Sequence, residues 1–121
     1  MEKLRSAREF RRILDHGRSY ANALFVVYAL PPEGPSGRIG VVVGRKFGTA
    51  VVRNRVRRRV LEAFRQGLGD PEMVKDVVII PRHAARDAEF RDLCRALWHI
   101  LYTAHALRGP QDASGERDVR I

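Results

Sequence analysis

The chain has 121 residues and a mass of 13.8 kDa, which suits one domain and excludes a multidomain machine. Hydrophobic residues make up 45% and charged residues 31%, so one core is expected and wholesale disorder is not. The longest apolar stretch, residues 23–32, is about half the roughly 20 residues of a membrane span. The single cysteine, Cys94, has no partner for a disulfide or a cysteine-based metal site. We expect a cytoplasmic protein without a membrane partner.

Positive charge is concentrated in one segment of the chain. The whole sequence holds 23 Lys and Arg against 14 Asp and Glu, a net charge of +9. Residues 45–65 alone carry eight bases and one acid, nearly all of the bases being arginine. Guanidinium groups bind phosphates through paired hydrogen bonds and stack on bases. A polyanion is therefore the leading hypothesis for the partner, and a solvated basic helix or an acidic protein partner is the alternative.

The first half of the chain predicts a helix followed by strands. Ser6 and Glu9 have capping-box spacing, and Gly17 ends the helical pattern. Residues 18–30 are expected to be extended, with apolar side chains on both faces. A loop is expected at residues 31–37, which hold three prolines and two glycines, before a short strand at 38–43.

The second half predicts a helix, a buried strand and a last helix. A glycine-bounded turn at 44–49 leads to a helix at 50–65, which Gly67 ends and whose apolar stripe is Val52, Val56, Val60, Ala63 and Phe64. Residues 75–81 predict a strand buried on both faces. Asp87 is expected to cap the last helix. The expected apolar stripe of that helix comprises Phe90, Leu93, Cys94, Leu97, Trp98, Leu101 and Tyr102.

The order helix, two or three strands, helix, strand, helix predicts an α+β fold, an α/β sandwich in which helices cover one sheet. We expect a single domain at 1–108 and a flexible polar tail at 109–121. The strand at 38–43, the helix at 50–65 and the strand at 75–81 form a candidate βαβ unit. Such crossovers are right-handed in roughly 98% of cases, so the general rule predicts that hand here.

The sequence argues against an active site within the protein. None of the four histidines has the i, i+4 partner of a helical metal site. The glycines at 40, 44 and 48 are not followed by the Lys and Ser or Thr of a phosphate-binding loop. Asp87, Glu89 and Asp92 lie where carboxylates offset a helix dipole. We therefore predict no catalytic residue, no metal site in the protein and no small-molecule substrate.

The helix at 50–65 predicts a surface that binds a polyanion. Helical projection places Arg55, Arg58 and Arg65 opposite the apolar stripe, with Arg53 and Arg57 near its edge. Like charges at this spacing repel one another and destabilise the helix, which indicates that a polyanion normally lies against it. The neighbouring Asn54 is suited to bond a base edge, a 2′-hydroxyl or the start of the helix.

A second surface is predicted between the first helix and the outer face of the strand that follows. Phe10, Leu14, Val26 and Tyr28 would line a groove there. Apolar and aromatic walls beside basic groups suit unpaired nucleotides. The alternative, that Phe10 and Leu14 are core residues, fits the sequence equally well.

Residues 38–65, RIGVVVGRKFGTAVVRNRVRRRVLEAFR, closely resemble the signature of the protein subunit of bacterial ribonuclease P. The distinctive part is a glycine turn with Lys46, then Arg53-Asn54-Arg55, a basic pair and Glu62-Ala63-Phe64. The order of elements matches over residues 4–105. Departures lie at Leu14, Gly44, Thr49 and Leu61, the last of which replaces a frequent arginine.

The resemblance implies the non-catalytic subunit of a ribonucleoprotein endonuclease that removes the 5′ leader of precursor tRNA. The RNA subunit would perform the hydrolysis with Mg²⁺. The implied fold is like a domain of ribosomal protein S5, with a left-handed βαβ crossover, and we follow this over the general rule. The chief rival is a general basic RNA-binding or ribosome-associated protein without a role in tRNA maturation.

Two sets of site residues follow from the resemblance. The residues expected to face the ribonuclease P RNA subunit are Arg45, Lys46, Arg53, Asn54, Arg55, Arg57, Arg58 and Arg65. The residues expected to line a cleft for the leader of precursor tRNA are Phe10, Leu14, Val26 and Tyr28. The third class of function, a protein-only nuclease, would need carboxylate ligands that the sequence does not supply.

Overall fold

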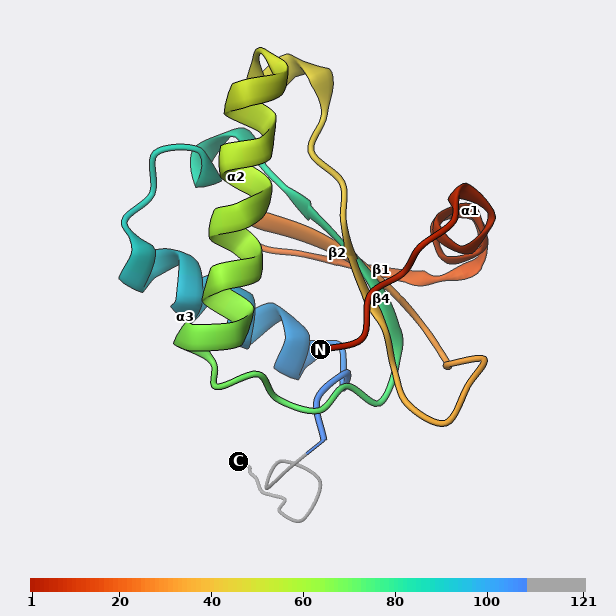
Figure 1. Cartoon of the computed structure of the whole chain (residues 1–121). Coiled ribbons are helices and arrows are strands. Elements are labelled where there is room, and N and C mark those ends of the chain that lie inside the picture. The colour runs from red at the N-terminus through yellow and green to blue at the C-terminus, as the bar shows by residue number, and fades with distance from the viewer. Residues whose placement is uncertain (109–121) are drawn as a thin grey trace.

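A computed structural model describes residues 1–108 (Figure 1). The main elements in chain order are α1 (Ala7–His16), β1 (Arg18–Ala21), β2 (Phe25–Leu30), β3 (Ile39–Val41), α2 (Ala50–Glu62), β4 (Asp76–Pro81) and α3 (Phe90–Thr103). Three short helical turns join them: η1 (Arg45–Phe47), η2 (Ala63–Gly67) and η3 (His83–Ala85). The predicted α+β order is confirmed. The expected tail at 109–121 lies outside the described residues.

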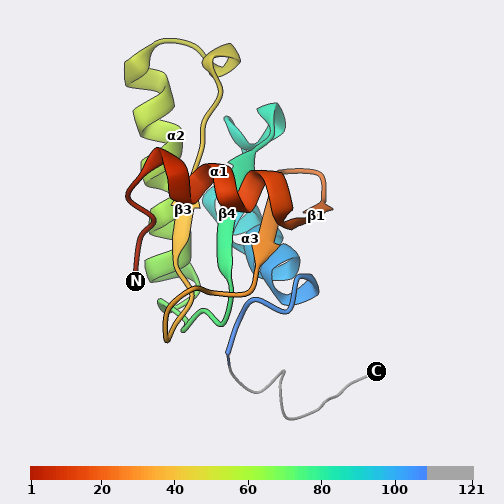
Figure 2. The same ribbon diagram turned by 90° about the vertical axis from the view of Figure 1, so that its right-hand side faces the viewer.

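The four strands form one mixed sheet in the order β1-β2-β4-β3. β2 pairs antiparallel with both β1 and β4, whereas β3 pairs parallel with β4. α2 and α3 cover one face, and α1 crosses the other (Figures 1 and 2). Within residues 1–108 no helix is long and apolar enough to cross a membrane.

The β3–α2–β4 crossover is left-handed. In Figure 2 both strands run upward with α2 behind the sheet, and the chain passes from β3 on the left to β4 in the centre. Seen from the helix side, this is a step to the left, whereas the common crossover steps to the right. The hand implied by the family resemblance is thus confirmed, and the general rule is wrong here.

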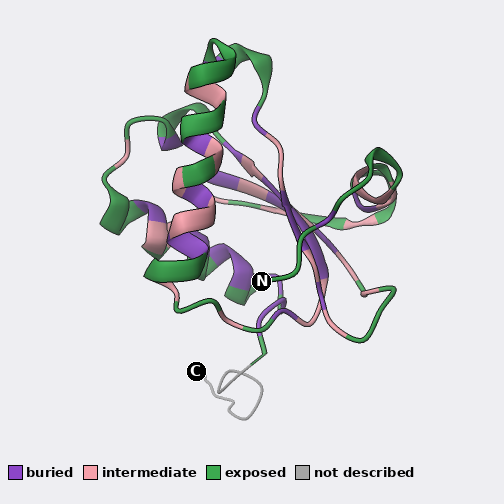
Figure 3. Cartoon of the chain, in the orientation of Figure 1, coloured by how far each residue is buried: buried purple, intermediate pink, exposed green. Residues whose placement is uncertain are grey.

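The main core lies between the sheet and the pair α2 and α3 (Figure 3). Along β2, burial alternates as predicted: Phe25, Val27 and Ala29 are buried against these helices, and the residues between them are half-buried on the α1 side. The central strand β4 is buried at five of its six positions. Helix residues complete this core, chiefly Val60, Ala63, Phe64, Leu93, Leu97 and Leu101.

A smaller apolar cluster holds α1 on the opposite face of the sheet. Its buried members are Leu4, Ile13 and Val78, and Phe10 packs at its edge. The Phe10 ring lies directly over Gly40 of β3, where a Cβ atom would overlap the ring. Glycine at this position therefore allows α1 to approach the sheet closely.

Residues 18–30 form two strands instead of one continuous segment. The side chain of Asn22 accepts hydrogen bonds from the backbone N–H groups of Leu24 and Phe25, at 3.0 and 2.9 Å. This local turn reverses the chain between β1 and β2. β3 is also shorter than the expected strand at 38–43, and α2 ends at Glu62 before continuing as the wider turn η2.

The prediction that Asp87 caps the last helix is wrong. α3 begins at Phe90, and the preceding Glu89 makes no side-chain capping bond. The guanidinium of Arg59 donates to the backbone oxygens of Arg86 and Ala88, at 3.3 and 2.6 Å. These bonds tie the segment after η3 to α2, so the chain there does not join the helix.

The predicted stripe of α3 is correct only in part. Leu93, Leu97 and Leu101 are buried, but Trp98 and Tyr102 are 45% and 36% exposed, and Phe90 is also exposed. The rings of Trp98 and Tyr102 stack on each other with centroids 4.9 Å apart. Ile100 is buried on this helix and was missing from the predicted stripe.

The start of α1 is fixed by the predicted capping box. Ser6 Oγ accepts from the backbone N–H of Glu9 at 3.2 Å, while the Glu9 carboxylate accepts from those of Arg5 and Ser6 at 2.8 and 3.0 Å. The same carboxylate accepts a hydrogen bond from Arg38. The two backbone donors, followed by Arg38, lower the pKa of Glu9 to about 2.

Replacing Glu9 by Gln should therefore destabilise the protein in a pH-dependent manner. Since the folded-state pKa of Glu9 lies below its ordinary value of 4.5, the stabilisation is complete above that pH and disappears as the pH falls to about 2. Urea unfolding of wild type and Glu9→Gln should show a difference in unfolding free energy at pH 7 that closes over this range. A difference that stays constant from pH 7 to pH 2.5 would contradict this assignment.

Candidate nucleic-acid interface

The basic helix α2 is anchored through its apolar side. Val56 and Val60 are buried, as are Ala63 and Phe64 in the turn that follows. Thr49 caps the start of the helix: its Oγ1 accepts a hydrogen bond from the backbone N–H of Val52 at 3.3 Å. The predicted stripe is confirmed except that Val52 is only half-buried.

The opposite side of α2 carries the predicted polar surface. Asn54, Arg55 and Arg58 are exposed, as is Arg65 in the following turn η2, while Arg53 and Arg57 are half-buried at the edge. Arg65 makes one exposed ion pair, 3.6 Å from Glu62, which contributes little in water. The arrangement presents several guanidinium groups to solvent from a backbone that packing holds in place.

Two further bases project from the turn η1, which precedes α2. Arg45 and Lys46 are exposed, while Phe47 is buried in a cluster with Val43 and Val56. Gly48 follows with a φ of 135°, a conformation that L side chains rarely adopt. The glycine and the buried ring therefore fix the position of both bases relative to α2.

Asn54 orients one of its neighbours. Arg57 Nη1 donates to Asn54 Oδ1 at 2.7 Å, a contact between residues one helical turn apart. The sequence had suggested a base edge, a 2′-hydroxyl or the helix start as partners for Asn54. In the structure the amide oxygen is bonded to Arg57, and the amide N–H₂ group remains a donor for other partners.

Arg59 differs from the arginines around it. It is half-buried, and its guanidinium donates to the two backbone oxygens beyond η3 described above. These bonds give Arg59 a structural role, and it is not among the residues predicted to face RNA. Sequence alone does not distinguish it from Arg58, because only the fold shows which arginine faces η3.

A groove of about 560 Å³ opens between α1 and the end of β3. One wall is formed by Phe10 and Leu14 of α1, and the other by residues 41–43. Arg5 and Arg11 lie along its α1 side, and Arg57 reaches it from α2. The lining combines apolar walls with three arginines and one acid, Asp15. Apolar walls beside an excess of basic residues are the composition expected of a site for unpaired nucleotides.

The structure brings together only part of the predicted cleft. Phe10 and Leu14 line the groove, but Val26 and Tyr28 lie on β2, which β4 separates from β3. Tyr28 packs against the cluster beneath α1. Sequence reasoning missed the wall at 41–43, where three consecutive valines indicated only a strand. Contact of any of these residues with RNA stays a prediction.

Within the described part of the chain, no three His, Cys, Asp or Glu side chains are placed to hold a metal ion together. The acidic residues at 87, 89 and 92 lie around the start of α3, where Glu89 and Asp92 are each 3.9 Å from Arg91.

Comparisons with known proteins all point to the same family. The family model described as Ribonuclease P matches residues 1–105. The ribonuclease P protein component of Clostridioides difficile is 37% identical over 101 residues, which cover 81% of this chain and 87% of that protein. That of Clostridium botulinum strain Langeland is 38% identical over 104 residues, 84% of this chain and 93% of that protein.

Solved structures of RNase P proteins resemble this chain in fold as well as in sequence. The RNase P protein of Staphylococcus aureus superposes with a TM-score of 0.76 at 31% identity, covering 89% of this chain and 99% of that one. The RNase P protein of Thermotoga maritima gives 0.75 at 34% identity, covering 90% and 100%. With a family match over nearly all the described residues and the same fold, this chain belongs to the ribonuclease P protein family.

Proposed function

We propose that this chain is the protein subunit of a ribonuclease P ribonucleoprotein, which removes the 5′ leader from precursor tRNA. Because the chain belongs to this family, it is expected to work in an endoribonuclease complex with an RNA partner. The specific partners proposed are the ribonuclease P RNA subunit and precursor tRNA. The rival, a basic RNA-binding protein unrelated to tRNA maturation, is not favoured by this membership.

The observation that carries the proposal is the position of Arg57. This residue is hydrogen-bonded to Asn54 on the arginine-rich surface of α2, and it also lines the α1–β3 groove. The two surfaces therefore adjoin. One protein of this shape is suited to hold a large structured RNA on α2 and a single strand in the groove at the same time.

The protein's part in the reaction is binding and positioning. Phosphate contacts from α2 and η1 would reduce repulsion between two RNAs, and the groove would extend the substrate contact along the leader. We assign the hydrolysis itself to the RNA subunit with Mg²⁺, which would polarise the phosphate and activate water there. The residues of this chain provide no nucleophile in that scheme.

Reconstituted cleavage is the direct test. Precursor tRNA is incubated at low Mg²⁺ with a bacterial ribonuclease P RNA, with and without this protein, and with the protein alone. The expected result is faster cleavage at the mature 5′ end only when RNA and protein are both present. Cleavage by the protein alone, or no stimulation despite binding to unrelated structured RNAs, would refute the proposal.

The exposed arginines of α2 should contribute to RNA-subunit binding through phosphates. Arg55→Gln should weaken this binding and lower the slope of log K against log salt by about 1, since one counterion-releasing contact is lost. Arg95→Gln is the charge-matched control, because Arg95 lies on α3 beside the β1–β2 turn. Identical slopes for wild type and Arg55→Gln would remove Arg55 from the interface.

The groove should affect only substrates with a leader. Leu14 is 37% exposed, so Leu14→Ala should leave folding intact while removing apolar contact with the strand. We expect KM for a long-leader precursor to rise roughly fivefold, equivalent to about 1 kcal/mol of lost contact. KM for a precursor with a one-nucleotide leader should not change. An equal increase for both substrates would show that Leu14 acts elsewhere.

A further inference from the structure

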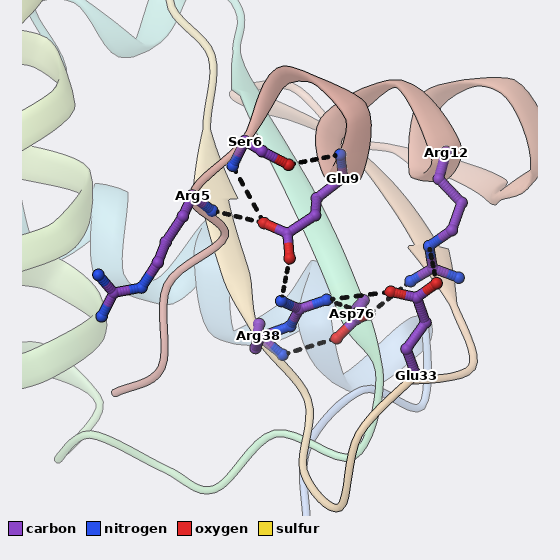
Figure 4. Close-up of polar contacts among 7 residues, drawn as sticks. All are labelled: Arg5, Ser6, Glu9, Arg12, Glu33, Arg38 and Asp76. Carbon is purple, nitrogen blue, oxygen red and sulfur yellow. Dashed lines mark hydrogen bonds and ion pairs between the residues drawn. The ribbon is translucent and has the colours of Figure 1, made fainter.

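A buried carboxylate lies beneath α1 at the start of β4. Asp76 is the one polar or charged side chain in the described region that is fully buried. Its oxygens accept hydrogen bonds from Arg12 Nη2 at 2.5 Å, from the backbone N–H of Arg38 at 2.9 Å and from Arg38 Nη2 at 3.4 Å. Helix α1, the residue before β3 and the first residue of β4 therefore meet at one carboxylate (Figure 4).

The same network extends to the N-terminus of α1. Arg38 also donates to Glu9, the capping-box residue of this helix. Glu33, from the loop before β3, lies 3.5 Å from Arg12 Nε and 3.6 Å from Arg38 Nη2. Figure 4 shows the two guanidinium groups converging between these carboxylates.

Stability alone is a weak explanation for such a cluster. Burying a carboxylate costs free energy that its partners must offset, and apolar residues of similar volume often stabilise a protein as well or better. Charged hydrogen bonds differ from apolar contacts in being directional, and the planar guanidinium fixes the angle as well as the distance. The cluster therefore supplies geometry that apolar packing of α1 does not.

The geometry concerns the rotation of α1 about its own axis. At 100° per residue, Glu9 and Arg12 lie on one side of Ile13, and Phe10 and Leu14 lie on the other. Ile13 is fully buried against the sheet. Phe10 packs over Gly40 on one side of Ile13, and without a restraint on the other side α1 could roll about these apolar contacts. The ionic contacts hold the Glu9 and Arg12 side of α1 against the sheet. They thereby fix how far the Phe10 and Leu14 side, which is a wall of the groove, lies above the sheet.

We propose that Asp76 is a positioning residue for the single-stranded RNA in the α1–β3 groove. By holding Arg12 and Arg38, it fixes the roll of α1 and with it the separation between Phe10 and Leu14 on one wall and residues 41–43 on the other. Asp76 itself is buried and does not touch the RNA. The inference rests on the proposed function of the groove and adds the residue that sets its width.

The test replaces Arg12 by Gln in the reconstituted holoenzyme. Arg12 is the residue of α1 that forms an ion pair with Asp76. In the Arg12→Gln variant, Arg38 still forms its own ion pair with this carboxylate. The matched control is Arg8→Gln, which makes the same charge change one turn earlier on the same helix. The Arg8 side chain is exposed, and within the described residues 1–108 it makes no hydrogen bond or ion pair.

We expect Arg12→Gln to raise KM for a long-leader precursor roughly tenfold, which is less than the hundredfold that a 1 Å misplacement can cost. The kcat, the KM for a one-nucleotide leader and the affinity for the RNA subunit should stay within about twofold of wild type. Arg8→Gln should change neither KM by more than this. Arg12→Lys, which keeps a cation facing Asp76, should recover part of the leader dependence.

Two results would overturn the inference. If Arg12→Gln and Arg8→Gln have equal effects on both substrates, the charge matters and the position of α1 does not. If Arg12→Gln weakens RNA-subunit binding and both substrates alike, the network serves folding alone. Asp76→Asn, followed by thermal unfolding, supplies a second variant with the same expected KM pattern. Failure of the proposed function is distinct, since the wild-type protein would then show no leader dependence.

Discussion

The arginine-rich side of this protein depends on apolar contacts that hold helix α2 in place, although the charges of this helix repel one another. α2 carries five arginines and one glutamate in 13 residues. Three arginine pairs fall at i, i+3 or i, i+4, and each such pair costs about 0.2–0.5 kcal/mol. Against this, burying a side chain such as Val56, Val60 or Phe64 contributes about 1.5–3 kcal/mol. The packing exceeds the repulsion severalfold, so the arginine surface is formed before any RNA arrives. A preformed surface loses less conformational entropy on binding.

Much of the fold could be predicted from the sequence because its signals are local. The capping box at Ser6 and Glu9, the alternation along β2 and the three-to-four spacing in α2 are each set by neighbours within one or two turns. The exposed arginines of α2 followed from the same projection. Neither local signals nor the general rule predicts the left-handed crossover. That prediction came from the family resemblance.

The features that were missed depend on contacts between distant residues. The start of α3 is displaced because Arg59 bonds backbone oxygens 27 and 29 residues further along the chain. Arg12 meets Asp76 across 64 residues, so nothing near either one in the sequence shows the pairing. The second wall of the groove was missed for a similar reason: the strand order places the end of β3, and not β2, beside the open side of α1.

The hand of the crossover decides whether the groove exists. With β3 and β4 parallel and adjacent, a right-handed connection would put α2 on the face that α1 occupies. The left-handed connection gives each helix its own face, with both flanking the edge strand β3.

Backbone pairing of residues 2–4 with Ile39 covers the first part of the β3 edge, before the chain turns into α1 at Ser6. Beyond it, residues 41–43 line the groove beside Arg57. An uncovered sheet edge normally invites another protein chain. Here the surrounding arginines repel a second basic copy and attract a polyanion, so the same edge is suited to RNA.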